Sequence, residues 1–156
     1  MAKAKDNTLI YLKESVDETF QSFNITDFQK YKILKGQVSF NGNYIVSMVG
    51  FVGEMTGMIS IYCSRQMALQ IATSMMGLQM EEIDQDVRDA VGEIANIVVG
   101  IFKAKFGTDH TPFQQSVPSV LDGHNFTSNN FDGQSNRLFA FESKAGTVYI
   151  QLLLKT

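Results

Sequence analysis

The chain has 156 residues, of which 44% are hydrophobic and 19% are charged, and its net charge is −3. This length predicts one domain with its own core, and the acidic balance argues against a nucleic-acid-binding module, which usually carries a basic excess. No apolar stretch approaches the roughly 18 residues of a membrane span, no signal peptide is expected, and the single cysteine, Cys63, excludes an internal disulfide and fits a reducing cytoplasm.

The first half of the chain is predicted to contain one helix, a group of strands and a second helix. From Thr8 to about Asn24, apolar residues recur at spacings of three and four, as on an amphipathic helix. Strands are expected where apolar residues alternate or run together, at Val38–Phe40, Tyr44–Val49 and 55–63. Ser64 is typical of a helix N-cap and Gly77 of a helix end, which predicts a helix over 65–76.

The second half begins with a long predicted helix, from about Gln85 to Phe106, closed by Gly107. Further strands are expected at Gln114–Leu121, Arg137–Glu142 and Thr147–Leu154. The polar stretch GHNFTSNNFDGQSN (123–136) is rich in Asn, Gly and Ser, which predicts a mobile surface loop.

The two halves resemble one another in the order of their elements. FVGEMTGMISIY (51–62) and FESKAGTVYIQL (141–152) share a turn, a glycine and an alternating apolar strand, which suggests an internal duplication of a helix and three strands. Short turns between strands imply antiparallel pairing, so the expected class is α+β, with helices packed on a largely antiparallel sheet.

The long helix has one apolar and one polar face. At about 100° per residue, its bulky apolar side chains fall on one arc, and a polar set falls on the opposite arc: Asp89, Glu93, Asn96, Gly100 and Lys103. Gly92 lies on or beside this polar face. Each glycine costs about 0.5–1 kcal/mol relative to alanine inside a helix, so we expect Gly92 and Gly100 to allow another backbone to approach.

The pattern Asp89-x-x-x-Glu93-x-x-Asn96-x-x-x-Gly100 resembles the signature of the CheC/CheX phosphatases of bacterial chemotaxis. Two flanking segments of that family are similar to SRQMALQIATSMMG and GFVGEMTGMISIY of this chain. A third segment of the family resembles TPFQQSVPSVLDG less closely. CheC proteins carry the Glu-x-x-Asn pair twice and CheX proteins carry it once. In the first helix Glu18 is followed by Gln21 rather than Asn, so residues 1–156 resemble a single CheX-like domain.

This resemblance implies a cytoplasmic phosphatase that hydrolyses the aspartyl phosphate of a CheY-type response regulator. Glu93 and Asn96 would be its catalytic pair, and Asp89, Gly92, Gly100 and Lys103 would contact the partner. The chain would need no cofactor of its own, because Mg²⁺ would be held by the response regulator. The resemblance also implies a homodimer formed through the sheets of two copies. The candidate strands for this contact are the apolar segments MISIY (58–62) and VYIQLLL (148–154).

Glu93 and Asn96 are residue types that suit the hydrolysis of an aspartyl phosphate. A carboxamide can accept and donate hydrogen bonds without repelling a phosphate, so Asn96 is suited to orienting the attacking water. An exposed glutamate titrates near 4.3, which makes Glu93 a poor base but a good partner for a lysine of the response regulator. A non-catalytic module of the same fold, which binds a receiver domain or a flagellar-switch partner, is the alternative.

The other reactive side chains give weaker signals. His110 and His124 lie in no ligand-spaced motif, so no metal site is expected. Cys63 lies in an apolar strand, which favours an inert core thiol over a nucleophile.

Overall fold

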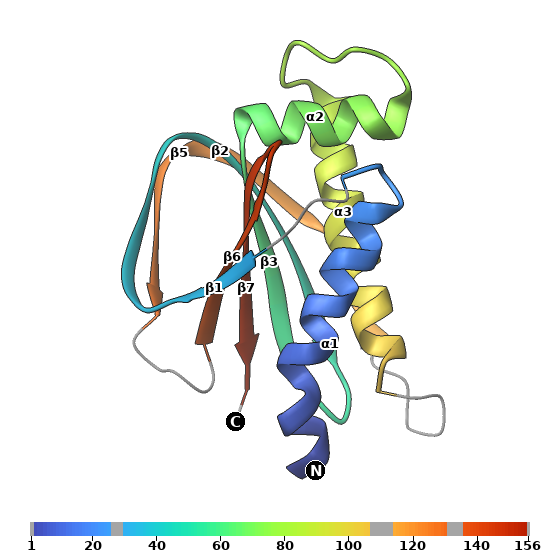
Figure 1. Ribbon diagram of the computed structural model, residues 1–156, viewed down its shortest axis with the longest axis vertical. Helices are drawn as coiled ribbons and strands as arrows, with labels where there is room; N and C mark the ends of the chain where they lie inside the picture. The colour runs from blue at the N-terminus through green and yellow to red at the C-terminus, as the bar shows by residue number, and fades with distance from the viewer. Residues whose placement is uncertain (1, 26–29, 107–113, 131–135, 156) are drawn as a thin grey trace.

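The computed structural model describes residues 2–25, 30–106, 114–130 and 136–155. In this part of the chain three helices lie on one side of a sheet (Figure 1): α1 Ala2–Gln21, α2 Arg65–Met76 and α3 Gln85–Ala104. α1 and α3 run side by side, and α2 crosses the end of α3. The expected α+β class is confirmed.

The helices form close to where the sequence predicts them. For α2 the agreement is complete, because the Ser64 hydroxyl accepts a hydrogen bond from the Met67 amide at 3.2 Å and Gly77 adopts a left-handed conformation at φ 70°. α1 begins at Ala2, six residues before the predicted start, and α3 ends at Ala104, two residues before the predicted end. Gly107 lies outside the described residues.

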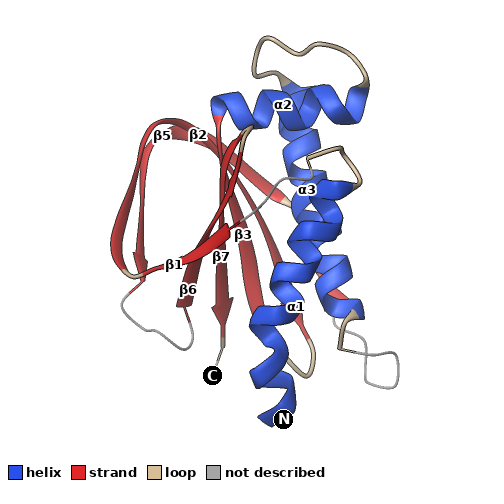
Figure 2. Ribbon diagram, in the orientation of Figure 1, coloured by secondary structure: helices blue, strands red, loops and turns tan. Residues whose placement is uncertain are grey.

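Seven strands form one antiparallel sheet in the described residues (Figure 2). They are β1 Lys30–Leu34, β2 Gly36–Val52, β3 Gly57–Ser64, β4 Gln114–Gln115, β5 Ser119–Asn130, β6 Asn136–Ser143 and β7 Gly146–Leu154. The order is β1-β6-β7-β3-β2-β4, and β5 also pairs with β2.

The pairing is symmetric about the two central strands, as the suggested duplication predicts. β3 and β7 pair antiparallel through the middle of the sheet, with Ile61 opposite Ile150. On one side β7 pairs with β6 and β6 with β1, and on the other β3 pairs with β2 and β2 with β5. The first strand of each half therefore lies in the sheet beside the second strand of the other half.

The main core lies between the sheet and the helices. The apolar stripe of α1 contributes Leu12, Val16 and Phe20, all at most 1% exposed, and α3 contributes the apolar arc predicted for it. A second, smaller cluster lies on the opposite face of the sheet, where Phe40 stacks on Tyr62 with ring centroids 4.6 Å apart. β2 and β5 curve over this cluster (Figure 1).

The prediction of a loop over 123–136 is wrong for the described residues 123–130, which belong to β5. Polar side chains hold this strand over the second cluster. The Gln151 amide donates to the Ser128 hydroxyl at 3.0 Å and accepts from the Tyr62 hydroxyl at 2.9 Å. These partners lie far apart in the chain. The local composition of this stretch is therefore that of a loop and does not reveal the strand.

Three other strand predictions need correction. Val38–Phe40 and Tyr44–Val49 are parts of the single strand β2, which continues through a bulge between Phe40 and Asn43. β1, with the sequence KYKIL, was not expected. The strand predicted at Gln114–Leu121 is divided into β4 and the start of β5.

The two strands considered for dimerisation do not lie at the edge of the sheet. MISIY belongs to β3, which is paired by β2 and β7, and VYIQLLL belongs to β7, which is paired by β3 and β6. Their low charge is explained by burial inside the sheet. In the described part of the chain, no helix is long and apolar enough to cross a membrane.

Candidate functional site

α3 presents the signature residues because its ends and its apolar face fix its orientation. The Asp84 carboxylate caps the helix by accepting from the Val87 amide at 3.0 Å, and Asp86 lies in the first turn, where the helix dipole favours an acid. Val91, Ile94 and other apolar residues of α3 are fully buried against the core. The polar residues of the signature therefore lie on the opposite, outer face of α3.

The structure brings five of the six predicted site residues onto the outer face of α3. Asp89 and Glu93 are exposed, and Asn96, Gly100 and Lys103 are partly exposed. Glu93 and Asn96 are three residues apart and therefore neighbours on this face. The Asp89 carboxylate accepts a hydrogen bond from the Gln85 amide of the same helix at 2.8 Å.

Gly92 does not share this face, which corrects the expectation that both glycines admit a partner. It is buried, and a Cβ built on it would lie 3.1 Å from Val120 Cγ2 and 3.4 Å from Pro118 Cβ. Residues 118–120 lead into and begin β5, which packs on α3. The glycine therefore permits a close approach within the fold.

Gly100, unlike Gly92, has open space beside it. A Cβ built at this position would meet no described atom within 4 Å. One helical turn after Asn96, the outer face of α3 is therefore open.

Asn96 has a partner that the sequence did not indicate. The Gln115 amide nitrogen donates to Asn96 Oδ1 at 2.7 Å and to the Asn96 backbone carbonyl at 3.3 Å. Gln115 belongs to β4, where it lies opposite Phe51 of β2. Gln115 lies within TPFQQSVPSVLDG, the segment that resembles the family more loosely, yet nothing in the composition of this segment indicates that Gln115 faces the helix.

The segment that follows Gln115 runs along α3 as far as the first turns of the helix. Arg88 of α3 and Asp122 of β5 form an ion pair in which the guanidinium donates to one carboxylate oxygen at 2.8 and 2.9 Å. Both side chains are partly exposed, so the pair adds about 0–1 kcal/mol and mainly fixes register. Contacts at Asn96, Gly92 and Arg88 thus tie residues 115–122 to three successive turns of the helix.

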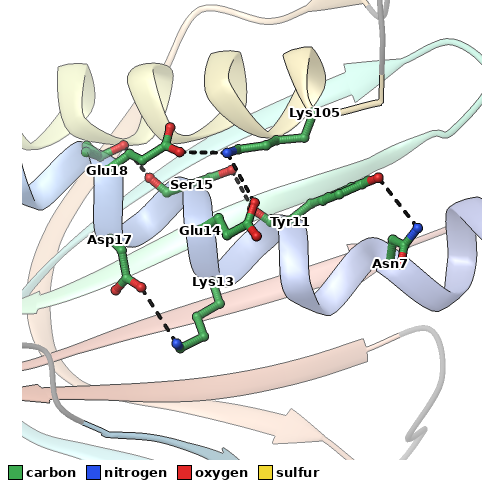
Figure 3. A network of polar contacts seen from close by, with 9 residues as sticks. Asn7, Tyr11, Lys13, Glu14, Ser15, Asp17, Glu18 and Lys105 are labelled. Atoms are coloured by element: carbon green, nitrogen blue, oxygen red, sulfur yellow. Dashed lines mark hydrogen bonds and ion pairs between the residues drawn. The ribbon is translucent and has the colours of Figure 1, made fainter.

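The carboxylates of α1 serve a different purpose from those of α3. Lys105, just after α3, forms ion pairs with Glu14 at 3.1 Å and Glu18 at 2.6 Å (Figure 3). Hydrogen bonds to Glu18 and Glu14 raise the pKa of Lys105. Glu14 and Glu18 therefore join α1 to the end of α3, which agrees with the absence of a second signature from the first helix.

Among the described residues, the Cys63 thiol and the His124 ring lie away from this face. Cys63 is buried in the core, as predicted, and burial raises the pKa of its thiol to about 12. His124 lies on β5 with its ring against the Asn43 amide, and His110 lies outside the described residues. The described residues contain no group of three or more His, Cys, Asp or Glu side chains that could hold a metal ion.

Comparison with known proteins identifies one matching family. The family model described as chemotaxis phosphatase CheX matches residues 45–142, which include α2, α3 and the strands β3, β4 and β5, and with β4 also Gln115. A search of curated proteins found no match.

Solved structures share the whole fold. A CheC-like superfamily protein from Shewanella sp. PV-4 is 27% identical, with a TM-score of 0.80 over 96% of this chain and 98% of that chain. Chemotaxis protein CheX from Desulfovibrio desulfuricans is 22% identical, with a TM-score of 0.79 over 96% and 99%. CheX from Borrelia burgdorferi, crystallised with CheY, BeF₃ and Mg²⁺, is 15% identical, with a TM-score of 0.71 over 95% and 97%.

Proposed function

Because the chain belongs to the family of the chemotaxis phosphatase CheX, we propose that it hydrolyses the aspartyl phosphate of a CheY-type response regulator. The observation that carries the proposal is the outer face of α3. There Glu93 is exposed, Asn96 is half-buried and held in place, and the surface at Gly100 is open. That the Borrelia burgdorferi protein was crystallised with CheY supports a receiver domain as the partner.

In this reaction water attacks the phosphorus atom and the bond to the aspartate oxygen breaks, which releases inorganic phosphate and a free carboxylate. Positioning and charge stabilisation supply most of the catalysis in such transfers. The Asn96 carboxamide orients the water, and Glu93 pairs with a lysine of the response regulator to fix the docking register. Asp89, Gly100 and Lys103 lie on the same face and contact the partner. Mg²⁺ is held by the response regulator and neutralises phosphoryl charge.

The test is phosphate release from a phosphorylated receiver domain, measured together with the Kd for the beryllofluoride-treated receiver. We expect Asn96→Ala to abolish stimulated release while the Kd stays within about twofold. This change also removes the hydrogen bond from Gln115, which contributes about 0.5–1.5 kcal/mol, so urea unfolding must show that the variant is folded. Full activity of Asn96→Ala would overturn the mechanism.

Charge reversal tests the docking role. Glu93→Lys should weaken binding, and the loss should shrink as salt screens the interaction. Glu81→Lys is the matched control, because it makes the same change in net charge at an exposed residue of the connection between α2 and α3. Equal losses from both variants would show a general charge effect. Tight binding of the phosphorylated receiver without faster release would favour the alternative, a non-catalytic binding module.

A homodimer also belongs to the proposal. In the described part of the sheet β1 pairs with β6 alone, and its Tyr31 and Ile33 side chains are 39% and 46% exposed. A free edge of this kind can pair with the same strand of a second copy. Light scattering over a dilution series should give about twice 17.4 kDa, and Ile33→Lys should shift the mass to that of a monomer. A monomer at micromolar concentration would remove this proposal.

A further inference from the structure

We propose that Gln115 is a positioning residue that determines which way the Asn96 carboxamide faces. The inference rests on the proposed function of Asn96 and concerns how the fold prepares that side chain. Its basis is the pair of hydrogen bonds from the Gln115 amide nitrogen to Asn96 Oδ1 at 2.7 Å and to the Asn96 backbone carbonyl at 3.3 Å.

The backbone carbonyl settles the orientation of both side-chain amides. A carbonyl oxygen can only accept, so the Gln115 atom that faces it must be the NH₂ group and not the amide oxygen. The same NH₂ group also faces the Asn96 side chain, where it needs a second acceptor. Asn96 must therefore turn Oδ1 toward Gln115, because the flipped amide would set one NH₂ group against another.

This orientation decides what Asn96 offers to a water molecule. Oδ1 keeps one lone pair, which can accept an O–H from the water and so leave the oxygen lone pair of that water free to attack phosphorus. The Asn96 NH₂ group is left to donate to a phosphoryl oxygen. In the flipped orientation the NH₂ group and Oδ1 would exchange places, so the water and the phosphoryl oxygen would each meet the wrong end of the amide.

Gln115 can hold this orientation because its own backbone is fixed on both sides. It is paired with β2 in β4, and the next residue, Ser116, is anchored to Gly50 twice. The Ser116 amide donates to the Gly50 carbonyl at 2.9 Å, and the Gly50 amide donates to the Ser116 hydroxyl at 3.0 Å. The ordering entropy of the Gln115 side chain is thus lost during folding and not when the receiver domain binds.

The hydrogen bond from Gln115 also explains how a partly exposed helix position can hold the Asn96 carboxamide in one orientation. A solvated Asn on a helix rotates freely and presents either end of its amide. Here β4 supplies a hydrogen-bond donor to the Asn96 side chain, while Asn96 remains partly exposed on the outer face of α3. The site is therefore built from α3 and β4 together.

Two variants of similar size separate the hydrogen bond from packing. Gln115→Met keeps the length of the side chain and removes the donor, and Gln115→Glu replaces the donor with an acceptor that attracts the Asn96 NH₂ group. Losing one neutral hydrogen bond changes the population of the correctly oriented Asn96 amide by about 3–10-fold. We therefore expect kcat for phosphate release to fall about 3–10-fold in Gln115→Met and further in Gln115→Glu. The Kd for the beryllofluoride-treated receiver should stay within about twofold in both.

Gln114→Met is the matched control, because Gln114 is the exposed neighbour in the same strand. It should leave kcat unchanged. The double variant Asn96→Ala/Gln115→Met should be no slower than Asn96→Ala, because Gln115 acts only through Asn96. An equal loss of kcat from Gln114→Met, or a further loss in the double variant, would overturn the inference in favour of a general effect of β4.

The outcomes distinguish this inference from the proposed function. If Asn96→Ala is inactive while Gln115→Met and Gln115→Glu keep full kcat, Gln115 has no positioning role and the phosphatase proposal stands. If Asn96→Ala keeps full activity, the proposed function fails and the role of Gln115 fails with it. A fall in kcat at constant Kd in both Gln115 variants, without effect in Gln114→Met, supports the positioning role.

Discussion

Gly100→Ala is expected to make the protein more stable and less active. Apart from the backbone of its own helix, no described atom would lie within 4 Å of a Cβ at this position, so the added methyl group meets no resistance from the rest of the fold. The gain is then the helix propensity difference between glycine and alanine, about 0.5–1 kcal/mol. For a chain of this size that corresponds to a rise of roughly 1–4 °C in Tm, or of about 0.25–0.5 M in the urea midpoint if the m-value is about 2 kcal/mol/M.

Gly92→Ala is the comparison that makes this prediction specific. The helix propensity gain is the same, but the new methyl group would lie 3.1 Å from Val120 Cγ2 and 3.4 Å from Pro118 Cβ. The neighbouring strand must then move by a few tenths of an ångström, and overpacking of this kind costs about 1–3 kcal/mol. We therefore expect no gain, or a loss, at position 92.

Urea unfolding of the two variants, followed by circular dichroism, measures this difference. Phosphate release then tests the partner face, since a methyl group at Gly100 should crowd the docked receiver domain and slow dephosphorylation. Equal stabilisation by both substitutions would refute the distinction between an open and a packed glycine. Unchanged activity of Gly100→Ala would show that the receiver domain does not reach this turn of the helix.

Three further predictions concern residues away from that face. The Cys63 thiol, buried and with its pKa raised to about 12, should not react with Ellman's reagent at pH 8 until the protein is unfolded in guanidinium; reaction within minutes in the native state would contradict its burial. Burial, with repulsion from Glu14 and Glu18, raises the pKa of Asp17 against the opposing effect of a nearby lysine, so ionisation of Asp17 disfavours the folded state above that pKa. Asp17→Asn should accordingly raise Tm at pH 7, with a gain that disappears as pH falls below the usual carboxyl pKa of about 4. Lys105→Met should lower Tm at neutral pH, because the raised pKa of Lys105 marks stabilising ion pairs; the difference from the parent protein should shrink in high salt and be lost as pH rises through that pKa.

Local signals in the sequence were sufficient to predict the helices. Ser64 and Gly77 mark the two ends of α2 by their own hydrogen-bonding and conformational preferences, and both act as predicted. The apolar period of α3 predicted which side chains enter the core and placed Glu93 and Asn96 on the outer face. In each case the relevant partners lie within a few residues along the chain.

Features that depend on distant partners were not predicted. The stretch 123–130 has the composition of a loop and becomes a strand because its backbone pairs with β2, far earlier in the chain, and because Ser128 accepts a hydrogen bond from the Gln151 side chain 23 residues later. The helical wheel placed Gly92 on or beside the polar face, because it contains no information about Pro118 and Val120, which pack against this glycine. The Gln115 contact to Asn96 spans 19 residues and depends on how β4 pairs with β2, which no local pattern encodes.

The exchange of strands between the two halves limits how the chain can be divided. β1 is paired by β6 and β5 by β2, so each half completes the sheet of the other. A cut in the connection between α2 and α3 would leave two fragments with unpaired strand edges, which must recombine before either buries its apolar surface. A single ancestral copy with the same pairing would have met this requirement by exchanging its first strand with a second copy. The pairing in the present chain has the form of a strand exchange between two halves that are joined in one polypeptide.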